Sequence, residues 1–379
     1  MTLPNILNPA KAEPTGIFPT QTLRNLIAEG VVMASETITP DLIQPASIDL
    51  RLGEFAWRVQ ASFLPGPDAT VEEKIRAFEM HRLDLTGGAV LEKGCVYIVP
   101  LMEALALPAD ISAFANPKSS TGRLDIFTRV ISDQGTRFDL IRPGYVGPLY
   151  AEVSPKTFSV AVRTGSRLSQ LRLRRGKSEV APAELLQLHN ESRLVDTDVD
   201  TAEIFEHQSL SLRLDLSGDS QDAIVGWRAR HHAGILDVDR PDHYDPNDFW
   251  EPVSARRNAI ILNPDDFYIL ATREAVTVPP DYAAEMVAYD TLVGEFRVHY
   301  AGFFDPGFGW DSENVSAGSR GVLEVRSHDV PFLLEHEQVI GRLRFERLTA
   351  RPEKIYGTEI GSHYQGQALK LAKQFKMSR

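Results

Sequence analysis

The chain has 379 residues, of which 43 % are apolar and 24 % are charged, and this composition excludes an intrinsically disordered chain. Its length favours two domains over one. The formal net charge of −12 disfavours nucleic acid as a partner, because an acidic surface repels a phosphate backbone and no basic stretch offsets it.

The chain's one cysteine, Cys95, excludes an internal disulfide and fits a reducing compartment. A zinc-dependent base deaminase holds its metal through a C-x-x-C pair, so a single cysteine also excludes that site. The first residues, MTLPNILNPAKAEPTG, lack the basic start and apolar core of a signal peptide, and no apolar run is long enough for a membrane span. We therefore expect a cytoplasmic protein with no membrane partner.

A helix is predicted near the start of the chain and a strand-rich body after it. In PTQTLRNLIAEG, Thr20 is a candidate N-cap, Leu23, Leu26 and Ile27 share one face, and Gly30 is a stop signal. Short runs of alternating apolar and polar residues follow, and they end at Gly, Pro, Asp or Asn. This pattern is typical of a β-sandwich or β-barrel.

The sequence also repeats itself. The stretch AVLEKGCVYIVPLMEALALPADISA from Ala89 aligns with IILNPDDFYILATREAVTVPPDYAA from Ile260, and matched segments lie on both sides of it, such as LSQLRL with IGRLRF. An ordered series of matches indicates two related domains. We place the first in residues 1–185 and the second in residues 186–379, joined near the polar, acidic stretch 176–205.

The stretch NPKSSTGRLD gathers four donors, Lys118, Ser119, Ser120 and Arg123, into one turn of chain. Such a mixture suits phosphate oxygens, because Arg gives a forked contact and Lys a point charge. A solvated turn between strands is the alternative. The matching stretch of the second repeat, AYDTLVGEF, lacks both cations and both serines, so the fold itself does not require them, and this favours a binding role.

Two glutamates occupy matching places in the repeats. Glu152 lies in GPLYAEVSP among apolar neighbours, and Glu324 falls on the same place in the second repeat. A partly desolvated glutamate has a raised pKa and can serve as a general base near neutral pH. A strand glutamate that points to water is the alternative, and the sequence alone leaves the facing open.

The stretch RARHHAGILDVDRPDHYDPND clusters histidines and aspartates. Their spacings match no closed ligand set, so a solvated acidic loop is favoured over a metal site, and we predict no metal ligands in this chain.

The end of the chain combines a glycine-rich stretch, EKIYGTEIGSHYQGQ, with a run at helical spacing, GQALKLAKQFK. The first either closes over a ligand or runs across the surface. The second predicts a helix.

Taken together, IQPASIDLRLG, PKSSTGRL, YAEV and HYQGQ resemble, in the same order along the chain, the motifs of the dCTP deaminase family in the trimeric dUTPase-like superfamily. The doubling makes the long two-repeat branch of that family the best match. The resemblance implies a mainly β fold, a tandem repeat of two dUTPase-like distorted jelly-roll β-barrels with a few short helices.

The resemblance also implies a function. Members of the family deaminate dCTP hydrolytically to dUTP and ammonia without zinc, which supplies dUTP toward dTTP, and their sites lie between subunits. Magnesium would enter with the triphosphate as a charge bridge. The implied partners are dCTP and dUTP, dTTP as a possible inhibitor, and copies of the chain in a homo-oligomer, with a trimer of two-barrel chains favoured.

Residue roles follow from the matched motifs. Glu152 would take a proton from water and pass it toward the cytosine amino group, while Ser119 and Arg123 position the nucleotide and polarise that water. Lys118 and Ser120 would face the triphosphate. The remaining implied contacts to the nucleotide are Asp305, His363, Tyr364 and Gln367.

Three positions depart from the family's pattern. Lys118 replaces an arginine, and His363 replaces a lysine. The Asp-Pro-Gly hairpin of the family reads Arg-Pro-Gly from Arg142 and survives only at Asp305, in the second repeat. The last departure favours a second hypothesis, a composite pocket in which the phosphate motif of one repeat works with Glu324 of the other.

Two rival functions stay open. One is a dUTPase, or a bifunctional enzyme that also releases pyrophosphate; the helix-like tail, which differs from the closing motif of a dUTPase, favours the deaminase. The other is a nucleotide-binding barrel without catalytic activity.

Overall fold

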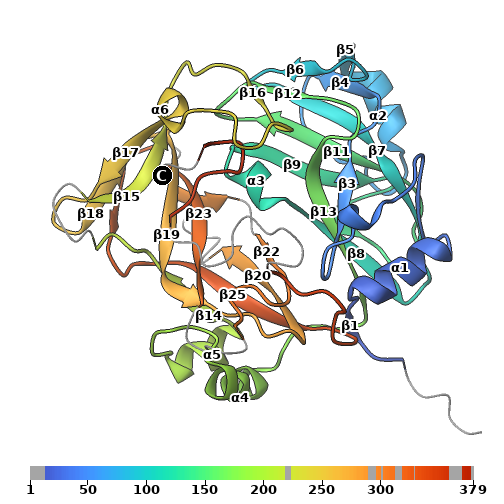
Figure 1. Cartoon of the computed structure of the whole chain (residues 1–379). Helices are drawn as coiled ribbons and strands as arrows, with labels where there is room; N and C mark the ends of the chain where they lie inside the picture. The colour runs from blue at the N-terminus through green and yellow to red at the C-terminus, as the bar shows by residue number, and fades with distance from the viewer. Residues whose placement is uncertain are drawn as a thin grey trace, which may run out of the picture.

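The computed structural model describes residues 13–217, 223–288, 296–299, 302–311, 318–327, 329–357 and 369–376. Strands dominate it, and two groups of sheets from the two halves of the chain lie side by side (Figure 1). The predicted mainly β, tandem-repeat fold with a few short helices is confirmed.

The first repeat contains two large sheets. In strand order, the five-stranded sheet holds β1 (Gly16–Ile17), β13 (Arg167–Arg175), β8 (Ile111–Pro117) and β10 (Leu140–Ile141), with β3 (Ile48–Arg51) also on β13. The six-stranded sheet holds β5 (Glu79–Asp84), β4 (Phe55–Val59), β7 (Val96–Ala106), β11 (Val146–Pro155) and β9 (Ile126–Ser132), with β2 (Val32–Ala34) also on β7.

The second repeat has sheets of matching order. The four-stranded sheet holds β14 (Leu210–Arg213), β25 (Val339–Arg347), β20 (Tyr282–Ala288) and β22 (Phe303–Phe304). The five-stranded sheet holds β17 (Trp250–Ser254), β15 (Ile224–Ala229), β19 (Phe267–Val276), β23 (Ser319–Ser327) and β21 (Phe296–His299), and β18 (Ala259–Leu262) pairs with β24 (Phe332–Glu335).

The two repeats share an equivalent buried hydrogen bond. The backbone N–H of Arg51 donates to Glu103 Oε2 over 2.7 Å, and that of Arg213 donates to Glu274 Oε2 over the same 2.7 Å. Each glutamate is fully buried, so it satisfies the same backbone group in both barrels. The alignment read from the sequence is therefore correct in register.

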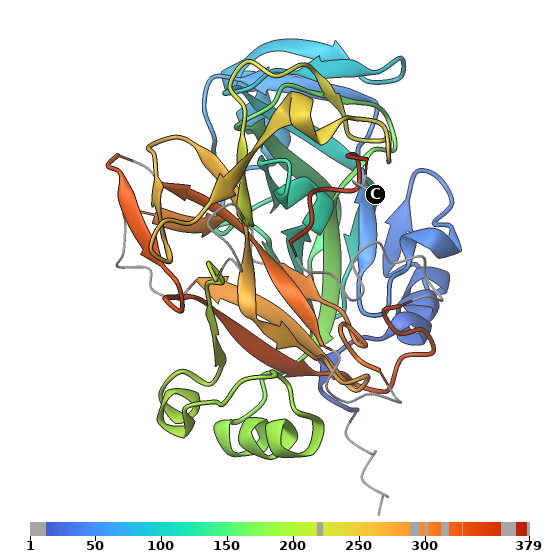
Figure 2. The same cartoon turned by 60° about the vertical axis from the view of Figure 1, so that its left-hand side comes forward.

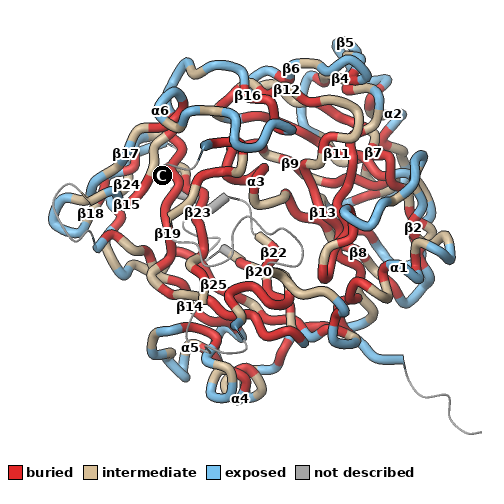
Figure 3. The backbone as a smooth tube through the Cα atoms, in the orientation of Figure 1, coloured by how far each residue is buried: buried red, intermediate tan, exposed pale blue. Residues whose placement is uncertain are grey.

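The two repeats share a core and are not separate bodies. Strand β16 (Leu236–Asp237) belongs to the second half but pairs with β12 (Val160–Val162), which in turn pairs with β6 (Ala89–Leu91). Trp250 is fully buried and packs edge-on against Phe158 of the first repeat, with 5.6 Å between ring centroids. Buried segments of both halves meet in the middle of the molecule (Figure 3).

The described helices are short and lie at the edges of the sheets or in connections. They are α1 (Thr20–Ala28), the 3-10 turn η1 (Pro40–Leu42), α2 (Val71–Phe78), α3 (Ser119–Gly122), α4 (Pro182–Ser192), α5 (Thr201–His207) and α6 (Pro246–Phe249). Two of them, α4 and α5, lie in the stretch between the repeats and project from the sheets (Figure 2). None of the helices in the described ranges is long and apolar enough to cross a membrane.

Two local predictions were wrong. The N-cap of α1 is Pro19, and Thr20 is the first helical residue, whose hydroxyl donates to the carbonyl of Gln44 over 2.9 Å. The helix expected at the end of the chain is absent from residues 369–376, which we call the C-terminal strap. There Phe375 packs on Trp250, with 5.9 Å between centroids, and Lys376 N–H donates to the Tyr244 carbonyl, so tertiary contacts override the helical spacing.

Candidate active site

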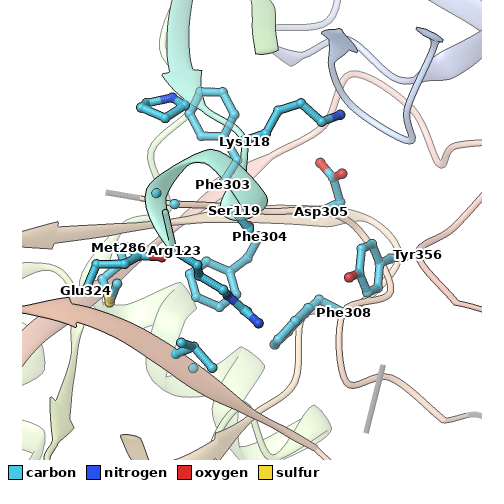
Figure 4. A pocket seen from close by; sticks show the side chains of 15 residues that line it. Lys118, Ser119, Arg123, Met286, Phe303, Phe304, Asp305, Phe308, Glu324 and Tyr356 are labelled. Atoms are coloured by element: carbon cyan, nitrogen blue, oxygen red, sulfur yellow. The ribbon is translucent and has the colours of Figure 1, made fainter. Parts of the chain in front are cut away.

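A pocket lies between the repeats at α3 (Figure 4). Strand β8 of the first repeat ends at Pro117, and Lys118 keeps an extended backbone before the single turn of α3. The facing wall comes from β20, β22 and β23 of the second repeat. The charged and hydroxyl side chains that line the pocket are Lys118, Ser119, Arg123, Asp305, Glu324 and Tyr356. Five of these six were singled out from the sequence, and they come from both repeats.

Glu324 is the buried acid of this pocket. It lies in the middle of β23 with only 4 % of its surface exposed. Burial raises the pKa of Glu324 well above its usual value; Arg123 opposes this shift and Asp125 adds to it. Within the described parts of the chain, no cation forms an ion pair with its carboxylate. A buried carboxyl group with a raised pKa can serve both as an acceptor and as a donor of a proton.

Glu152 does not line this pocket. It has the same register as Glu324, with Ile98 as its partner on β7 where Glu324 has Ile269 on β19. Arg129 on the neighbouring strand holds it, with Nη2 at 2.5 Å and Nε at 3.1 Å from Oε1. The guanidinium also stacks on Phe138, 3.4 Å from the ring centroid. The structure therefore separates Glu152 from the phosphate motif and brings Glu324 to it.

Asp305 is held across the repeats by Arg172 of β13. Arg172 is completely buried, and its Nη2 lies 3.2 Å from Asp305 Oδ1. The same guanidinium donates to the carbonyls of Ala284 and Phe304 over 3.1 and 3.0 Å. Burial raises the pKa of Asp305, and Arg172 opposes the rise. The hairpin that begins at Asp305 is thus fixed to the first repeat.

The cations of the phosphate motif have partners in the first repeat and in the strap. The ammonium of Lys118 contacts the carboxylate of Asp49, which is almost fully buried. Arg123 is buried, and its Nη1 donates to the carbonyl of Lys370 over 3.0 Å. Ser120 is also buried, but it does not line the pocket. The predicted contact of Ser120 with the triphosphate therefore has no support from the pocket lining, which contains Lys118, Ser119 and Arg123.

Two further lysines, Lys370 and Lys373, were missed by the sequence reasoning; they line a second pocket, at the strap, and lie near these cations. Burial lowers the pKa of Lys373, and the nearby Lys118 lowers it further. Burial and Arg123 together lower the pKa of Lys370. Burial is the main cause of both shifts, and the nearby cations Lys118 and Arg123 add to it. The signal available in the sequence was the set of three lysines in ALKLAKQFK, whose helical spacing favours a helix.

Of the remaining predicted contacts, His363, Tyr364 and Gln367 lie outside the described residues. Tyr356, just before them, lines the pocket: its ring packs on Phe308, 5.5 Å between centroids, and its N–H donates to the Pro306 carbonyl over 2.7 Å. The chain therefore passes the pocket wall immediately before the predicted closing segment.

The histidine and aspartate cluster makes ion pairs through Arg163 and a hydrogen-bond contact through His231. Arg163 Nη2 lies 2.6 Å from Asp237 Oδ2 and Arg163 Nη1 lies 2.7 Å from Asp239 Oδ2, while His231 Nε2 lies 2.8 Å from Asp266 Oδ1. Across the described ranges, no three His, Cys, Asp or Glu side chains come together as a group that could hold a metal ion.

The double barrel carries a pocket between its repeats that is lined by two cations of the first repeat and a buried glutamate of the second. The family model for the N-terminal domain of 2′-deoxycytidine 5′-triphosphate deaminase matches residues 14–177, and the model for its C-terminal domain matches residues 181–375. The chain belongs to this family, as its sequence motifs predicted.

Individual relatives agree with the family. The crystal structure of 2′-deoxycytidine 5′-triphosphate deaminase from Agrobacterium tumefaciens is 54 % identical, covers 88 % of this chain and 99 % of its own, and superposes with a TM-score of 0.83. The dCTP deaminase of Haloarcula marismortui is 31 % identical over 38 % of this chain and 73 % of its own. A dUMP-forming dCTP deaminase from Mycolicibacterium gilvum is 31 % identical over 43 % of this chain and 86 % of its own. The last name conflicts with dUTP as the final product.

Proposed function

We propose that this chain deaminates dCTP by hydrolysis in the pocket between its repeats, with Glu324 as the base. The observation that carries the proposal is a buried carboxyl group with a raised pKa in the same pocket as Ser119 and Arg123. Of the two hypotheses drawn from the sequence, the composite pocket is the one that we retain. Glu152 has a structural role in its ion pair with Arg129.

The reaction replaces the C4 amino group of cytosine with oxygen. The Glu324 carboxylate takes a proton from water, and the resulting hydroxide attacks C4. The same carboxyl group then returns the proton toward the amino group, which leaves as ammonia, so dCTP and water give dUTP and ammonia. Ser119 and Arg123 orient the nucleotide and the water. A raised pKa suits a group that must both accept and release a proton in one cycle.

The triphosphate would lie against the cations that gather at α3 and the strap. Lys118, Arg123, Lys370 and Lys373 supply positive charge there. We propose that Mg²⁺ enters with the nucleotide, held by phosphate oxygens, and that the chemistry at C4 needs no zinc. Asp305 would contact the sugar or phosphate side of the nucleotide, because it lines the pocket beside Lys118 (Figure 4).

A second candidate product is dUMP. It is favoured by one observation, the dUMP-forming activity named for relatives such as the dCTP deaminase of Mycolicibacterium gilvum. In that case water also attacks the α-phosphate, and pyrophosphate leaves after deamination. The chain's trimeric assembly, its inhibition by dTTP and its cytoplasmic location are further parts of the proposal.

One experiment tests the function and the product together. The purified protein is incubated with dCTP and MgCl₂, and ammonia, dUTP, dUMP and pyrophosphate are measured over time. Ammonia with dUTP alone supports the main proposal, and ammonia with dUMP and equimolar pyrophosphate supports the second candidate. Binding of dCTP without ammonia would overturn both and identify a nucleotide-binding barrel. CTP and dCMP, run in parallel, show which part of the nucleotide is selected.

A further inference from the structure

A second contact joins the repeats directly beside Glu324. Arg326 follows Glu324 by two residues on β23, so both side chains belong to the same face of the strand. Asp125 follows Arg123 by two residues in the turn after α3 and has a left-handed backbone, with φ of 54°. The Arg326 guanidinium contacts the Asp125 carboxylate, and the side chains are 12 % and 1 % exposed. The contact thus joins the turn after Arg123 to the strand that carries Glu324.

Hydrogen bonds fix this ion pair in one geometry. Arg326 Nη2 also donates to Thr157 Oγ1 over 2.8 Å, and that hydroxyl donates to Asp125 Oδ2 over 2.6 Å. The other Nη group contacts the carbonyl of Asp265. A guanidinium with partners on several sides cannot shift without losing more than one of them. Strand β23 is therefore tied to the turn that carries the phosphate motif.

The matching positions of the other repeat lack this pair. In the alignment that places Glu152 on Glu324, Ser154 falls on Arg326. In the stretch that matches the phosphate motif, AYDTLVGEF, Phe296 falls on Asp125. The barrel therefore forms without an ion pair at this place. It is present only where a phosphate motif and a pocket glutamate come together, and this indicates a role in the site more than in the fold.

We propose that Arg326 and Asp125 form a positioning clamp, which holds Glu324 of the second repeat in line with Ser119 and Arg123 of the first. This inference rests on the proposed function. The clamp aligns two walls that the chain contributes separately, and an error of about 1 Å in such an alignment can lower turnover by ~10²-fold.

The clamp also sets the charge around Glu324. Asp125 raises the pKa of Glu324 and Arg123 lowers it. Arg326 neutralises Asp125 at contact distance. On the neighbouring strands, the register partners of Glu324 are Ile269 and His299. Removal of Asp125 or of Arg326 therefore changes this charge balance in opposite directions.

The test is the pH dependence of kcat/KM for dCTP in Asp125→Asn, Arg326→Gln and the double variant. We expect the acidic limb to move to lower pH in Asp125→Asn, because a negative charge beside Glu324 is lost. It should move to higher pH in Arg326→Gln, because Asp125 is left uncompensated, and return close to wild type in the double variant. In all three, kcat should fall by ~10–100-fold while KM changes much less.

Two further variants keep the test decisive. Arg163→Gln removes another ion pair between the repeats, that with Asp237, away from the pocket; it should lower the melting temperature without moving the pH profile. Arg326→Lys keeps the charge but loses the fork, so kcat should fall with an unmoved pH profile, and this variant serves if Arg326→Gln does not fold.

The outcomes separate the two proposals. If wild type makes no ammonia, or Glu324→Gln keeps full turnover, the proposed function fails. If those results stand but the Asp125 and Arg326 variants lose only thermal stability, as Arg163→Gln does, the clamp is overturned and the pair is structural.

Discussion

Glu152 and Glu324 occupy the same position in two copies of one barrel, yet their surroundings differ. Both are almost fully buried, at 1 % and 4 % exposure, and both sit on the same central strand of their repeat. Arg129 holds Glu152 from the next strand, whereas Glu324 faces a pocket whose other wall comes from the first repeat. The two glutamates therefore share a register. Their surroundings differ because of the residue on the neighbouring strand and the wall supplied by the other barrel.

Neutralising each glutamate in turn should give the largest difference between the two sites. Glu324→Gln should lower kcat for dCTP deamination by ~10³-fold or more, because the amide cannot accept the proton of the attacking water. Glu152→Gln should retain kcat within about threefold, because its partner Arg129 lies outside the pocket. Ammonia release at saturating dCTP measures both. Equal losses in the two variants would remove the distinction between the sites.

For the free energy of unfolding, Glu152→Gln should be the more damaging of the two variants. Glu152→Gln leaves the half-buried Arg129 guanidinium without its carboxylate, and removal of one partner from a buried pair costs about 1–3 kcal/mol of the free energy of unfolding once the 22 % exposure of the arginine is considered. Urea unfolding followed by tryptophan fluorescence measures this cost. A neutral effect would mean that Arg129 finds another acceptor or that water already screens the pair.

Glu324→Gln should instead stabilise the protein, and only above acidic pH. The pKa of Glu324 is higher in the folded state than in the unfolded state, so the folded state binds the proton more tightly. Stability is therefore full below the unfolded pKa and is lost as pH rises through the folded pKa. The amide avoids this loss, so its stabilising effect is absent at acidic pH and grows as pH rises above the unfolded pKa. Melting temperatures of both proteins across this range provide the check, and a parallel offset at every pH would contradict it.

More of the fold than of the candidate site could be predicted from the sequence. The repeat was visible because Arg51 with Glu103 and Arg213 with Glu274 preserve a buried contact that both barrels need. The choice between the glutamates was not visible, because Arg129 is 23 residues from Glu152 and meets it only through strand pairing. Likewise, ALKLAKQFK has helical spacing, but Phe375 is drawn into an aromatic cluster formed by distant residues.

A smaller effect is expected in the strap, where Lys373 adds positive charge near Lys118. Lys373→Met should raise KM for dCTP by about tenfold, the equivalent of roughly 1.4 kcal/mol, because one cation near Lys118 is lost. The rise should be smaller for dCMP, which carries fewer phosphate charges. Lys376→Met is the matched control, since Lys376 belongs to the same strap but is exposed. Equal rises for dCTP and dCMP would show that Lys373 supports the strap and not the triphosphate. A selective rise would place the cations of α3 and the strap in a single phosphate-binding group, next to Glu324 and remote from Glu152.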